Sequence, residues 1–243
     1  TGVALAVALN ADECQIYTDV DGIFTTDPRV CSKARLLKEV SFEEMLELSS
    51  SGAKVLQLRS VEYASKFNLP IRVLSSFNEG DGTLVQEEKN IMERPIVSGI
   101  SSIDTEAKLT IRGVPDVPGI AAKILSPISE AGIEVDVIVQ NISADNCTDF
   151  TFTVDKGDAE NAKEILQKTS ASLGGGLVEV DHDIAKISVV GRGMRAHAGV
   201  ASKMFQALAK DEINISMITT SEIKISVVIL SLIHISEPTR RYF

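Results

Sequence analysis

The fold class that we expect for the first part of the chain rests on residues 14–29. Their sequence is Cys14-Gln-Ile-Tyr-Thr18-Asp-Val-Asp-Gly-Ile-Phe-Thr-Thr-Asp-Pro-Arg29. The stretch 14–18 suits a short buried strand. Asp19-Val-Asp-Gly22 then supplies turn-forming residues that end the strand.

Helical patterns follow this strand. The spacing Ser41-Phe-Glu-Glu44 predicts a capping box at the start of a helix. A second helix is predicted from about Ala53 to Phe67, with Leu56 on its apolar stripe, and residues 71–74 suit another strand. Because strands alternate with helices, residues 1–77 predict an α/β domain with a parallel sheet.

Residues 78–95 differ in composition from their surroundings. Asn78-Glu-Gly-Asp-Gly-Thr83 is rich in turn-forming residues, and a charged run and Pro95 come after it. We interpret residues 78–95 as a linker between domains.

The remainder of the chain is duplicated at an offset of roughly 80 residues. The matching segments, in the same order in both copies, are Lys108-Leu-Thr-Ile-Arg-Gly113 with Lys186-Ile-Ser-Val-Val-Gly191, Gly119-Ile-Ala-Ala-Lys123 with Gly199-Val-Ala-Ser-Lys203, and Ile133-Glu-Val-Asp136 with Ile213-Asn-Ile-Ser216. Each copy suits a strand, a glycine-containing loop, an amphipathic helix and a strand. Two copies are too few for a solenoid, so we expect paired βαββαβ-like units that complete one another's sheets.

The composition argues against several classes of protein. A net charge of −10 disfavours nucleic-acid and anionic-membrane partners. The three cysteines include no Cys-x-x-Cys pair, which argues against a disulfide framework and a zinc site and favours a reducing cytoplasm. The three histidines support no Ser/His/Asp or Cys/His arrangement, and we expect no metal-ligand set. The start lacks Met and suits the inside of a helix, so we expect preceding protein and interpret the chain as a fragment.

The turn after the first strand has chemistry that suits a nucleotide. Phe24 could stack on a base, Arg29 could pair with phosphate, and Asp19 or Asp21 could order a ribose or a hydrated Mg²⁺. The alternative is a polar turn in which the Asp side chains cap their own backbone. Composition alone leaves both interpretations open.

Motifs within residues 17–64 resemble, in order and spacing, the second half of the aspartate kinase catalytic domain, which has the amino-acid kinase fold. They are Tyr-Thr-Asp-Val-Asp-Gly, Thr-Thr-Asp-Pro-Arg, Ser-Phe-Glu-Glu-Met-Leu-Glu-Leu, Gly-Ala-Lys-Val-Leu and Arg-Ser-Val-Glu-Tyr-Ala. The two repeats resemble the tandem ACT domains of that family. The resemblance implies a partial amino-acid kinase domain in 1–77, a first ACT domain in 96–170 and an incomplete second one in 171–229, each ACT domain with a ferredoxin-like βαββαβ fold.

The resemblance also implies a set of ATP contacts: Thr18, Asp19, Phe24, Arg29, Lys54 and Val55. The family often has Tyr at position 24, so a contact made by a phenol hydroxyl is lost here while stacking survives. Lys54 lies where we expect a helix to begin, and free N–H groups beside an ammonium suit phosphate. Without the family context, an isolated helix lysine is a solvated side chain.

An amino-acid effector site is implied in the two repeats, with the residues Asp116, Gln140, Asn141, Val200, Asn214, Ile215, Thr220 and Ser221. Asp116 lies in a loop that enters a helix, and Gln140-Asn141 follows the next predicted strand, with amides that suit an α-carboxylate and an amine. The alternatives are an N-cap role for Asp116 and a simple turn at 140–141. His197 is expected to be a polar loop residue.

Two features depart from the family. The Lys-Phe-Gly-Gly phosphate-binding segment and the aspartate-binding residues have no counterpart, so we assign no catalytic residue here and expect no kinase activity from this chain alone. Residues 230–243 do not match the family and resemble translated sequencing-adapter sequence, which we interpret as an artefact of sequence assembly.

The resemblance implies a fragment of an enzyme that phosphorylates L-aspartate to 4-phospho-L-aspartate with Mg²⁺-ATP, the first step toward lysine, threonine and methionine. Lysine and/or threonine would regulate it through the ACT domains. The implied assembly is a homodimer through the ACT domains, or a heteromer with a full-length subunit. The alternatives are a stand-alone ACT module that binds an effector without catalysis, and another amino-acid kinase with an attached sensor.

Overall fold

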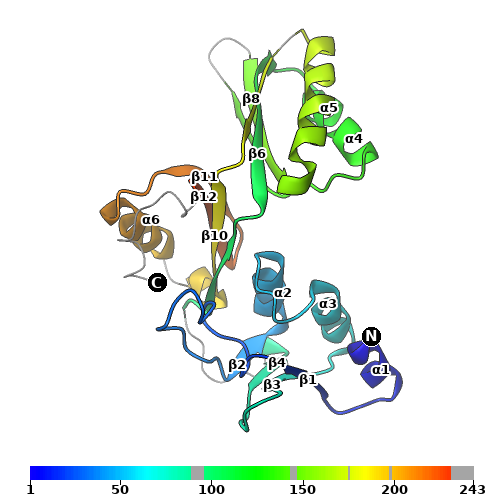
Figure 1. Ribbon diagram of the computed structural model, residues 1–243, viewed down its shortest axis with the longest axis vertical. Coiled ribbons are helices and arrows are strands. Elements are labelled where there is room, and N and C mark those ends of the chain that lie inside the picture. Colours follow the sequence, from blue (N-terminus) through cyan, green and yellow to red (C-terminus); the bar gives the residue numbers. More distant parts are fainter. Residues whose placement is uncertain (89–95, 143–146, 175, 197–198, 231–243) are drawn as a thin grey trace. The chain divides into compact units, whose positions relative to one another are not determined.

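The computed structural model describes residues 1–88, 96–142, 147–174, 176–196 and 199–230 (Figure 1). The chain divides into two compact units. Of the described residues, unit 1 contains 1–103 and 187–227, and unit 2 contains 104–186 and 228–230. Apart from Leu230, the tail interpreted as an artefact lies outside the described residues.

A four-stranded sheet with the order β1-β3-β4-β2 organises the first part of unit 1. Its strands and helices are α1 (Gly2–Ala8), β1 (Cys14–Thr18), β2 (Glu39–Ser41), α2 (Phe42–Ser50), α3 (Leu58–Phe67), β3 (Ile71–Ser75) and β4 (Thr83–Gln86). β1 pairs parallel with β3, in register from Cys14–Ile71 to Thr18–Ser75. β4 pairs antiparallel with β3, so the sheet is mixed rather than purely parallel.

β4 lies inside the stretch that the sequence predicts to be a linker. Thr83 and Val85 are fully buried, and they alternate with half-buried Leu84 and Gln86. The turn-forming residues at 78–82 therefore connect two strands rather than two domains. Gly82 has a φ of +61°, and a Cβ there would lie 2.0 Å from the Val73 carbonyl oxygen, so the turn requires glycine.

The capping box at the start of α2 is confirmed. The Ser41 hydroxyl oxygen accepts from the Glu44 N–H at 3.2 Å, and Glu44 Oε2 accepts from the Ser41 N–H at 3.2 Å. The predicted start of the next helix is wrong, because α3 begins at Leu58 with Gln57 as its N-cap. Leu56 is 5% exposed and packs in the core from the connection before the helix, and Gln57 after it has extended backbone with φ −71° and ψ 131°.

The first repeat forms a complete βαββαβ unit, as expected. Its elements are β6 (Glu106–Pro115), α4 (Ile120–Glu130), β7 (Ile138–Ile142), β8 (Cys147–Asp155), a 3-10 turn η2 (Lys156–Asp158), α5 (Ala159–Ser172) and β9 (Leu177–Asp181). The strand order is β7-β8-β6-β9, and α4 and α5 cover one face of this sheet (Figure 1). Apolar side chains from both helices and the sheet, including Leu109, Ile124, Phe152 and Leu166, form its core.

The second repeat completes its sheet with a strand from before the first repeat. Its own elements are β10 (Ile184–Val190), the 3-10 turn η3 (Arg192–Ala196), α6 (Val200–Lys210), β11 (Ile215–Thr220) and β12 (Lys224–Leu230). The strand order is β11-β12-β10-β5, where β5 is Gly99–Ile103. β5 thus takes the place beside β10 that β9 takes beside β6.

Two strands therefore lie in sheets other than those expected from the division into 96–170 and 171–229. β5 was expected with the first repeat and β9 with the second. Local periodicity predicts that a strand forms, but the partner of an edge strand is set by distant residues, which explains the difference. The exchange agrees with the expectation that the repeats complete one another's sheets.

No helix in the described ranges is both long enough and apolar enough to cross a bilayer.

The pair Glu13–Arg72 links the chain ahead of β1 with β3 and gives a pH-dependent prediction. Arg72 Nε and Nη2 lie 2.9 and 2.8 Å from Glu13 carboxylate oxygens, and the hydrogen bond from Arg72 lowers the pKa of Glu13 below 4.5. Ionised Glu13 therefore stabilises the folded chain above that value, and this stabilisation is lost as the pH falls through the lowered pKa. We expect Arg72→Met to cost about 1 kcal/mol at pH 7 and much less at pH 3.

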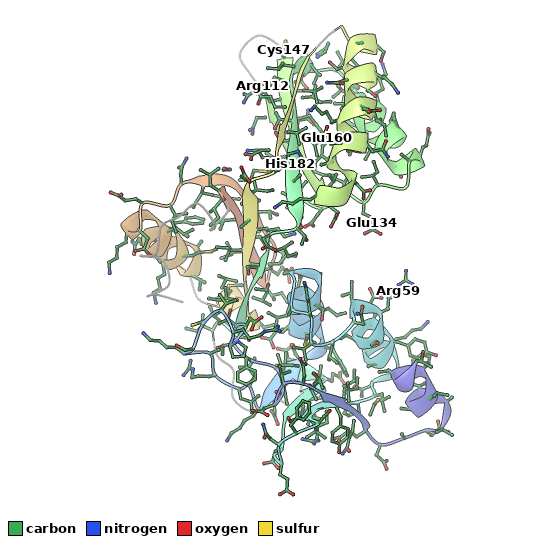
Figure 2. All side chains as sticks on the ribbon, in the orientation of Figure 1. Arg59, Arg112, Glu134, Cys147, Glu160 and His182 are labelled. Carbon is green, nitrogen blue, oxygen red and sulfur yellow. The ribbon has the colours of Figure 1, made fainter. Side chains whose placement is uncertain are left out.

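Urea unfolding at both pH values measures this difference. Arg59→Met is the matched control, because Arg59 is exposed on α3 (Figure 2). A loss for Arg72→Met that is equal at pH 7 and pH 3 contradicts the prediction.

Candidate functional site

The first candidate site lies at the edge of the first sheet where β1 and β3 end. Thr18 is the last residue of β1, and its carbonyl accepts from the Ser76 N–H at 2.8 Å. α3 leads into the start of β3, so the segment before α3 lies toward the opposite, carboxyl edge. The topology thus brings Thr18 and Asp19 to the same edge as Lys54 and Val55.

The polar groups after β1 are ordered by short-range hydrogen bonds. The Thr18 hydroxyl donates to Asp19 Oδ1 at 3.0 Å, and Asn78 Nδ2 donates to Asp21 Oδ1 at 2.8 Å. Both aspartates are exposed, so their remaining oxygens face solvent. Neither carboxylate caps its own turn, which was the alternative interpretation of this segment.

Thr83 of β4 forms hydrogen bonds to the backbone of the loop that contains Phe24. The buried Thr83 hydroxyl oxygen accepts from the Ile23 N–H at 2.9 Å and donates to the Leu37 carbonyl at 2.6 Å. Phe24 pairs with Leu36 in an isolated antiparallel bridge and is half-buried. The hydroxyl of Thr83 therefore fixes the backbone on both sides of that bridge.

Arg29 is tied to Asp27 at the far end of the loop. Its Nε and Nη2 lie 3.1 and 3.0 Å from the two Asp27 carboxylate oxygens. The hydrogen bond from Arg29 lowers the pKa of Asp27, and the same bond, with a contribution from the nearby Asp19 charge, raises the pKa of Arg29. The Arg29 side chain is 77% exposed, so one face of a pre-oriented guanidinium is open to an anion.

Lys54 lies in the connection between α2 and α3, and not at a helix start as predicted. It is exposed and makes no ion pair with any described residue, whereas Val55 is half-buried against the core. Gly52, just before it, has a φ of +105°, and a Cβ there would lie 2.7 Å from the Ser102 carbonyl oxygen. The close approach of Gly52 to the Ser102 backbone therefore fixes the conformation of the segment that leads to Lys54.

This edge of the sheet can hold a phosphorylated ligand. Two cations, Arg29 and Lys54, suit phosphate oxygens, and Asp19 and Asp21 suit hydroxyls or a hydrated cation. Within the described residues, no group of three or more His, Cys, Asp or Glu side chains could hold a metal directly.

The first repeat brings its predicted effector residues to one end of its sheet. Val114 of β6 and Ile142 of β7 both pair with Thr148 of β8, from opposite sides. The ends of β6 and β7 are therefore about 10 Å apart, two strand spacings, which suits an amino acid. Asp116 follows the first of these ends, and Gln140 and Asn141 lie at the second.

Two details of this end differ from the sequence interpretation. The N-cap of α4 is Gly119 and has no side-chain cap, so Asp116 is not a capping residue. Its carboxylate is exposed and has no hydrogen bond or ion pair with any described residue. Gln140 and Asn141 lie within β7 rather than in a turn beyond it, because pairing with β8 is irregular around Asp136 and β7 begins only at Ile138.

The second repeat separates its predicted effector residues into two groups. The Gly191 N–H donates to the Ile223 carbonyl at 2.9 Å, which puts the loop into α6 beside the turn after β11. Val200, the first residue of α6, lies at this end with Thr220 and Ser221. Ile215 begins β11 and Asn214 precedes it, so both lie about 17 Å away along the strand. His197 lies outside the described residues, as does His234.

The remaining histidine is a surface residue. His182 Nε2 lies 3.3 Å from Glu160 Oε1 of α5, and both side chains are exposed (Figure 2). This contact is an exposed surface interaction of little energetic weight.

Sequence reasoning missed the residues that support the site. Asn78 and Thr83 were assigned to the linker, although both bond to the loop that follows β1. The Gly-Thr pair after a turn-rich stretch was the available signal for a strand start at Thr83. Arg192 was not singled out, yet it pairs with Glu43 and Glu88.

Comparison with known proteins identifies these elements. Residues 1–75 match the model of the amino acid kinase family, and residues 109–173 and 187–231 match models of the ACT domain. Together they define a kinase fold with tandem ACT domains.

Curated relatives narrow this class further. An aspartokinase of Pseudomonas aeruginosa is 64% identical over 231 residues, which cover 94% of this chain and 56% of the relative. An aspartokinase of Helicobacter pylori is 51% identical over 233 residues, covering 94% of this chain and 57% of the relative. The chain therefore belongs to the aspartate kinase family. It spans just over half the length of the curated relatives it matches.

Solved structures agree with this assignment. Aspartokinase III of E. coli in complex with aspartate and ADP matches 95% of this chain and 51% of its own length, with a TM-score of 0.80 and 29% identity. The regulatory subunit of aspartate kinase from Thermus thermophilus matches 56% of this chain and 90% of its own length, with a TM-score of 0.54 and 41% identity. The resemblance found in the sequence motifs is thus confirmed.

The support that Thr83 gives to the loop can be tested by removing its hydroxyl. Thr83→Val leaves the Ile23 N–H and the Leu37 carbonyl unsatisfied in a buried place, so we expect a loss of about 3 kcal/mol in unfolding free energy. Hydrogen exchange of residues 22–37 should rise with it. Thr83→Ser keeps the hydroxyl and should cost only about 1 kcal/mol. Equal losses for the two variants would show that the hydrogen bonds contribute little.

Proposed function

We propose that this chain carries the nucleotide-binding side and the amino-acid sensor of an enzyme that phosphorylates L-aspartate to 4-phospho-L-aspartate with Mg²⁺-ATP. The product class leads toward lysine, threonine and methionine. The proposal is supported by the 64% identity to an aspartokinase and by the position of Thr18 at the end of β1, beside the end of β3. The chain order places the connection that carries Lys54 toward the same edge.

In this proposal the residues at the carboxyl edge of the first sheet contact different parts of Mg²⁺-ATP. Arg29 and Lys54 neutralise phosphate oxygens, and the Asp27 carboxylate keeps the Arg29 fork oriented. Asp19 and Asp21 bind the ribose or the water shell of Mg²⁺, and Phe24 stacks on the base with Val55 beside it. Phosphoryl transfer depends on charge neutralisation and positioning, which these groups supply on the nucleotide side.

The chain itself is proposed not to catalyse the transfer. Its sequence contains no Lys-Phe-Gly-Gly segment, and no described residue is assigned to aspartate. The acceptor carboxylate would then lack a binding site, and ATP would have no nucleophile placed in line with its γ-phosphate.

The effector site is proposed at the ends of the ACT sheets. In the first repeat, the Asp116 carboxylate would bind the α-ammonium, and the Gln140 and Asn141 amides would bind the α-carboxylate. Val200, Thr220 and Ser221 offer an apolar contact and hydroxyls at the corresponding end of the second repeat. Asn214 and Ile215 are proposed effector contacts at its other end, where they would meet a different effector molecule. Lysine and/or threonine are the proposed effectors. One solved aspartokinase III structure from E. coli, 28% identical with a TM-score of 0.75, holds lysine and aspartate.

A second candidate function is regulation without catalysis. It is favoured by the T. thermophilus regulatory subunit, of which this chain matches 90% at 41% identity. The kinase segment 1–75 argues for the first candidate, because a sensor alone needs no nucleotide edge. Pairing of ACT sheets between chains, as a homodimer or with a longer subunit, is compatible with both. The buried thiols of Cys14 and Cys31 suit a reducing compartment such as the cytoplasm.

Nucleotide binding distinguishes the two candidates. Calorimetric titration with Mg²⁺-ATP should show binding to the chain, and Arg29→Met or Lys54→Met should weaken it at least about tenfold, since each removes a charge-assisted contact. Lys33→Met, an exposed lysine in the same loop, should leave the affinity unchanged. Hydroxylamine should trap no acyl phosphate from aspartate. Effector binding without nucleotide binding would favour the regulatory candidate.

Effector binding tests the sensor directly. Titration with lysine and with threonine should show binding of at least one, and Asp116→Asn should weaken it about tenfold or more through loss of the ammonium contact. Asp104→Asn makes the same charge change at an exposed site of the same unit and serves as control. Equal affinities for the two variants would place the effector elsewhere.

A further inference from the structure

Helix α2 of the kinase segment contacts the second-repeat sheet along its length. At its start, Glu44 Oε1 accepts from the Ser98 hydroxyl and, at 3.1 Å, from the Arg192 N–H. In its middle, Glu47 pairs with Lys224 of β12 at 2.7 Å. Just past its end, Gly52 packs against the backbone of Ser102 in β5. All of these residues belong to unit 1.

Arg192 begins the loop that leads from β10 into α6. Its side chain forms ion pairs with Glu43 and with Glu88, the latter at 2.7 Å, and is 18% exposed. The carboxylates of Glu43 and Glu44 from the kinase segment, and that of Glu88 just after β4, thus hold the first residue of this loop. Paired charges that are mostly buried resist separation, because each would lose its partners in a place where water replaces them poorly.

The backbone before Arg192 is also fixed. A Cβ on Gly191 would lie 2.4 Å from the Ile96 carbonyl oxygen, and the Ser98 N–H donates to the Val190 carbonyl at 2.8 Å. The loop therefore cannot shift at its start without moving residues 96–98. Ser98 is itself bonded to Glu44, so such a shift reaches α2 by a second route.

α2 connects these contacts to Lys54. The helix has nine residues and is about 13 Å long, and its hydrogen bonds continue past its end. The Ser51 N–H donates to the Glu47 carbonyl at 3.0 Å, and the Ala53 N–H donates to the Leu48 carbonyl at 2.9 Å. These bonds tie the segment that carries Lys54 to the helix that begins beside Glu44.

We propose that Arg192 and Glu44 are positioning residues that couple the second-repeat loop, through α2, to Lys54. Occupation of the loop end by an effector would then change the affinity for nucleotide without any contact between the two ligands. This inference rests on the proposed role of Lys54 in nucleotide binding and of the loop end in effector binding. The coupling of Arg192 and Glu44 to the segment around Lys54 is argued from the described contacts and does not depend on either ligand.

The test uses the chain 1–243 and follows hydrogen exchange by peptide. Arg192→Met removes both ion pairs, and exchange in residues 51–57 should rise about tenfold while β3 keeps its wild-type rate. Arg192→Lys keeps the charge but loses the fork geometry, so it should give an intermediate rise. Arg72→Met is the matched control, since it breaks another partly buried arginine–glutamate pair in unit 1. It should not raise exchange in residues 51–57 selectively.

Ligands complete the experiment. Saturating effector, lysine or threonine, should alter exchange in residues 51–57 of the wild type and leave that of Arg192→Met unchanged, although both bind the effector. Arg192→Met should also weaken Mg²⁺-ATP binding several-fold. A uniform rise across unit 1, or the same pattern in Arg72→Met, overturns the coupling role. Failure of the proposed function would show separately, as absent ATP binding to the wild type with the exchange pattern intact.

Discussion

The Glu44 carboxylate is buried and accepts hydrogen bonds on both of its oxygens. One oxygen accepts from the Ser41 N–H and hydroxyl, and the other from the Ser98 hydroxyl and the Arg192 N–H. A carboxylate has about four acceptor positions, so this charge is fully satisfied without water. Burial of an ionised group is tolerated only under such conditions, and the contacts around Glu44 are therefore mutually dependent.

The Glu44 carboxylate bonds both to a residue near it in sequence and to residues far along the chain. Toward Ser41 it completes the capping box that starts α2, and toward Ser98 and Arg192 it joins the kinase segment to the second repeat. A purely local cap would need only the first pair of bonds. The second pair makes the beginning of α2 a place where the kinase segment and the second repeat share one residue.

Sequence reasoning succeeded where the signal is local. The capping box of Ser41 and Glu44 depends on residues three apart, and the βαββαβ order of the first repeat follows from periodicity. Sequence reasoning failed where packing against residues far along the chain determines the start of a helix or strand. Leu56 packs into the core and delays α3 to Leu58, and Thr83 is a buried strand residue within a turn-rich stretch. The exchange of β5 and β9 between sheets leaves no trace in either strand, because edge partners are chosen by residues far along the chain.

The candidate sites show the same division. Family motifs named Arg29 and Asp116, and the structure leaves both exposed. The supporting residues Asn78, Thr83 and Arg192 act through contacts with segments distant in sequence, and motif spacing does not reveal those contacts.

The strand exchange has a consequence for synthesis on the ribosome. β5 ends at Ile103, whereas its partner β10 begins only at Ile184. At translation rates of about 5–20 residues per second, β10 is synthesised roughly 4–16 s after β5. The first repeat can fold within that interval, since all of its strands lie between β5 and β10. During this interval the short, serine-containing sequence of β5, Gly-Ile-Ser-Ser-Ile, offers a poor template for pairing with other nascent chains.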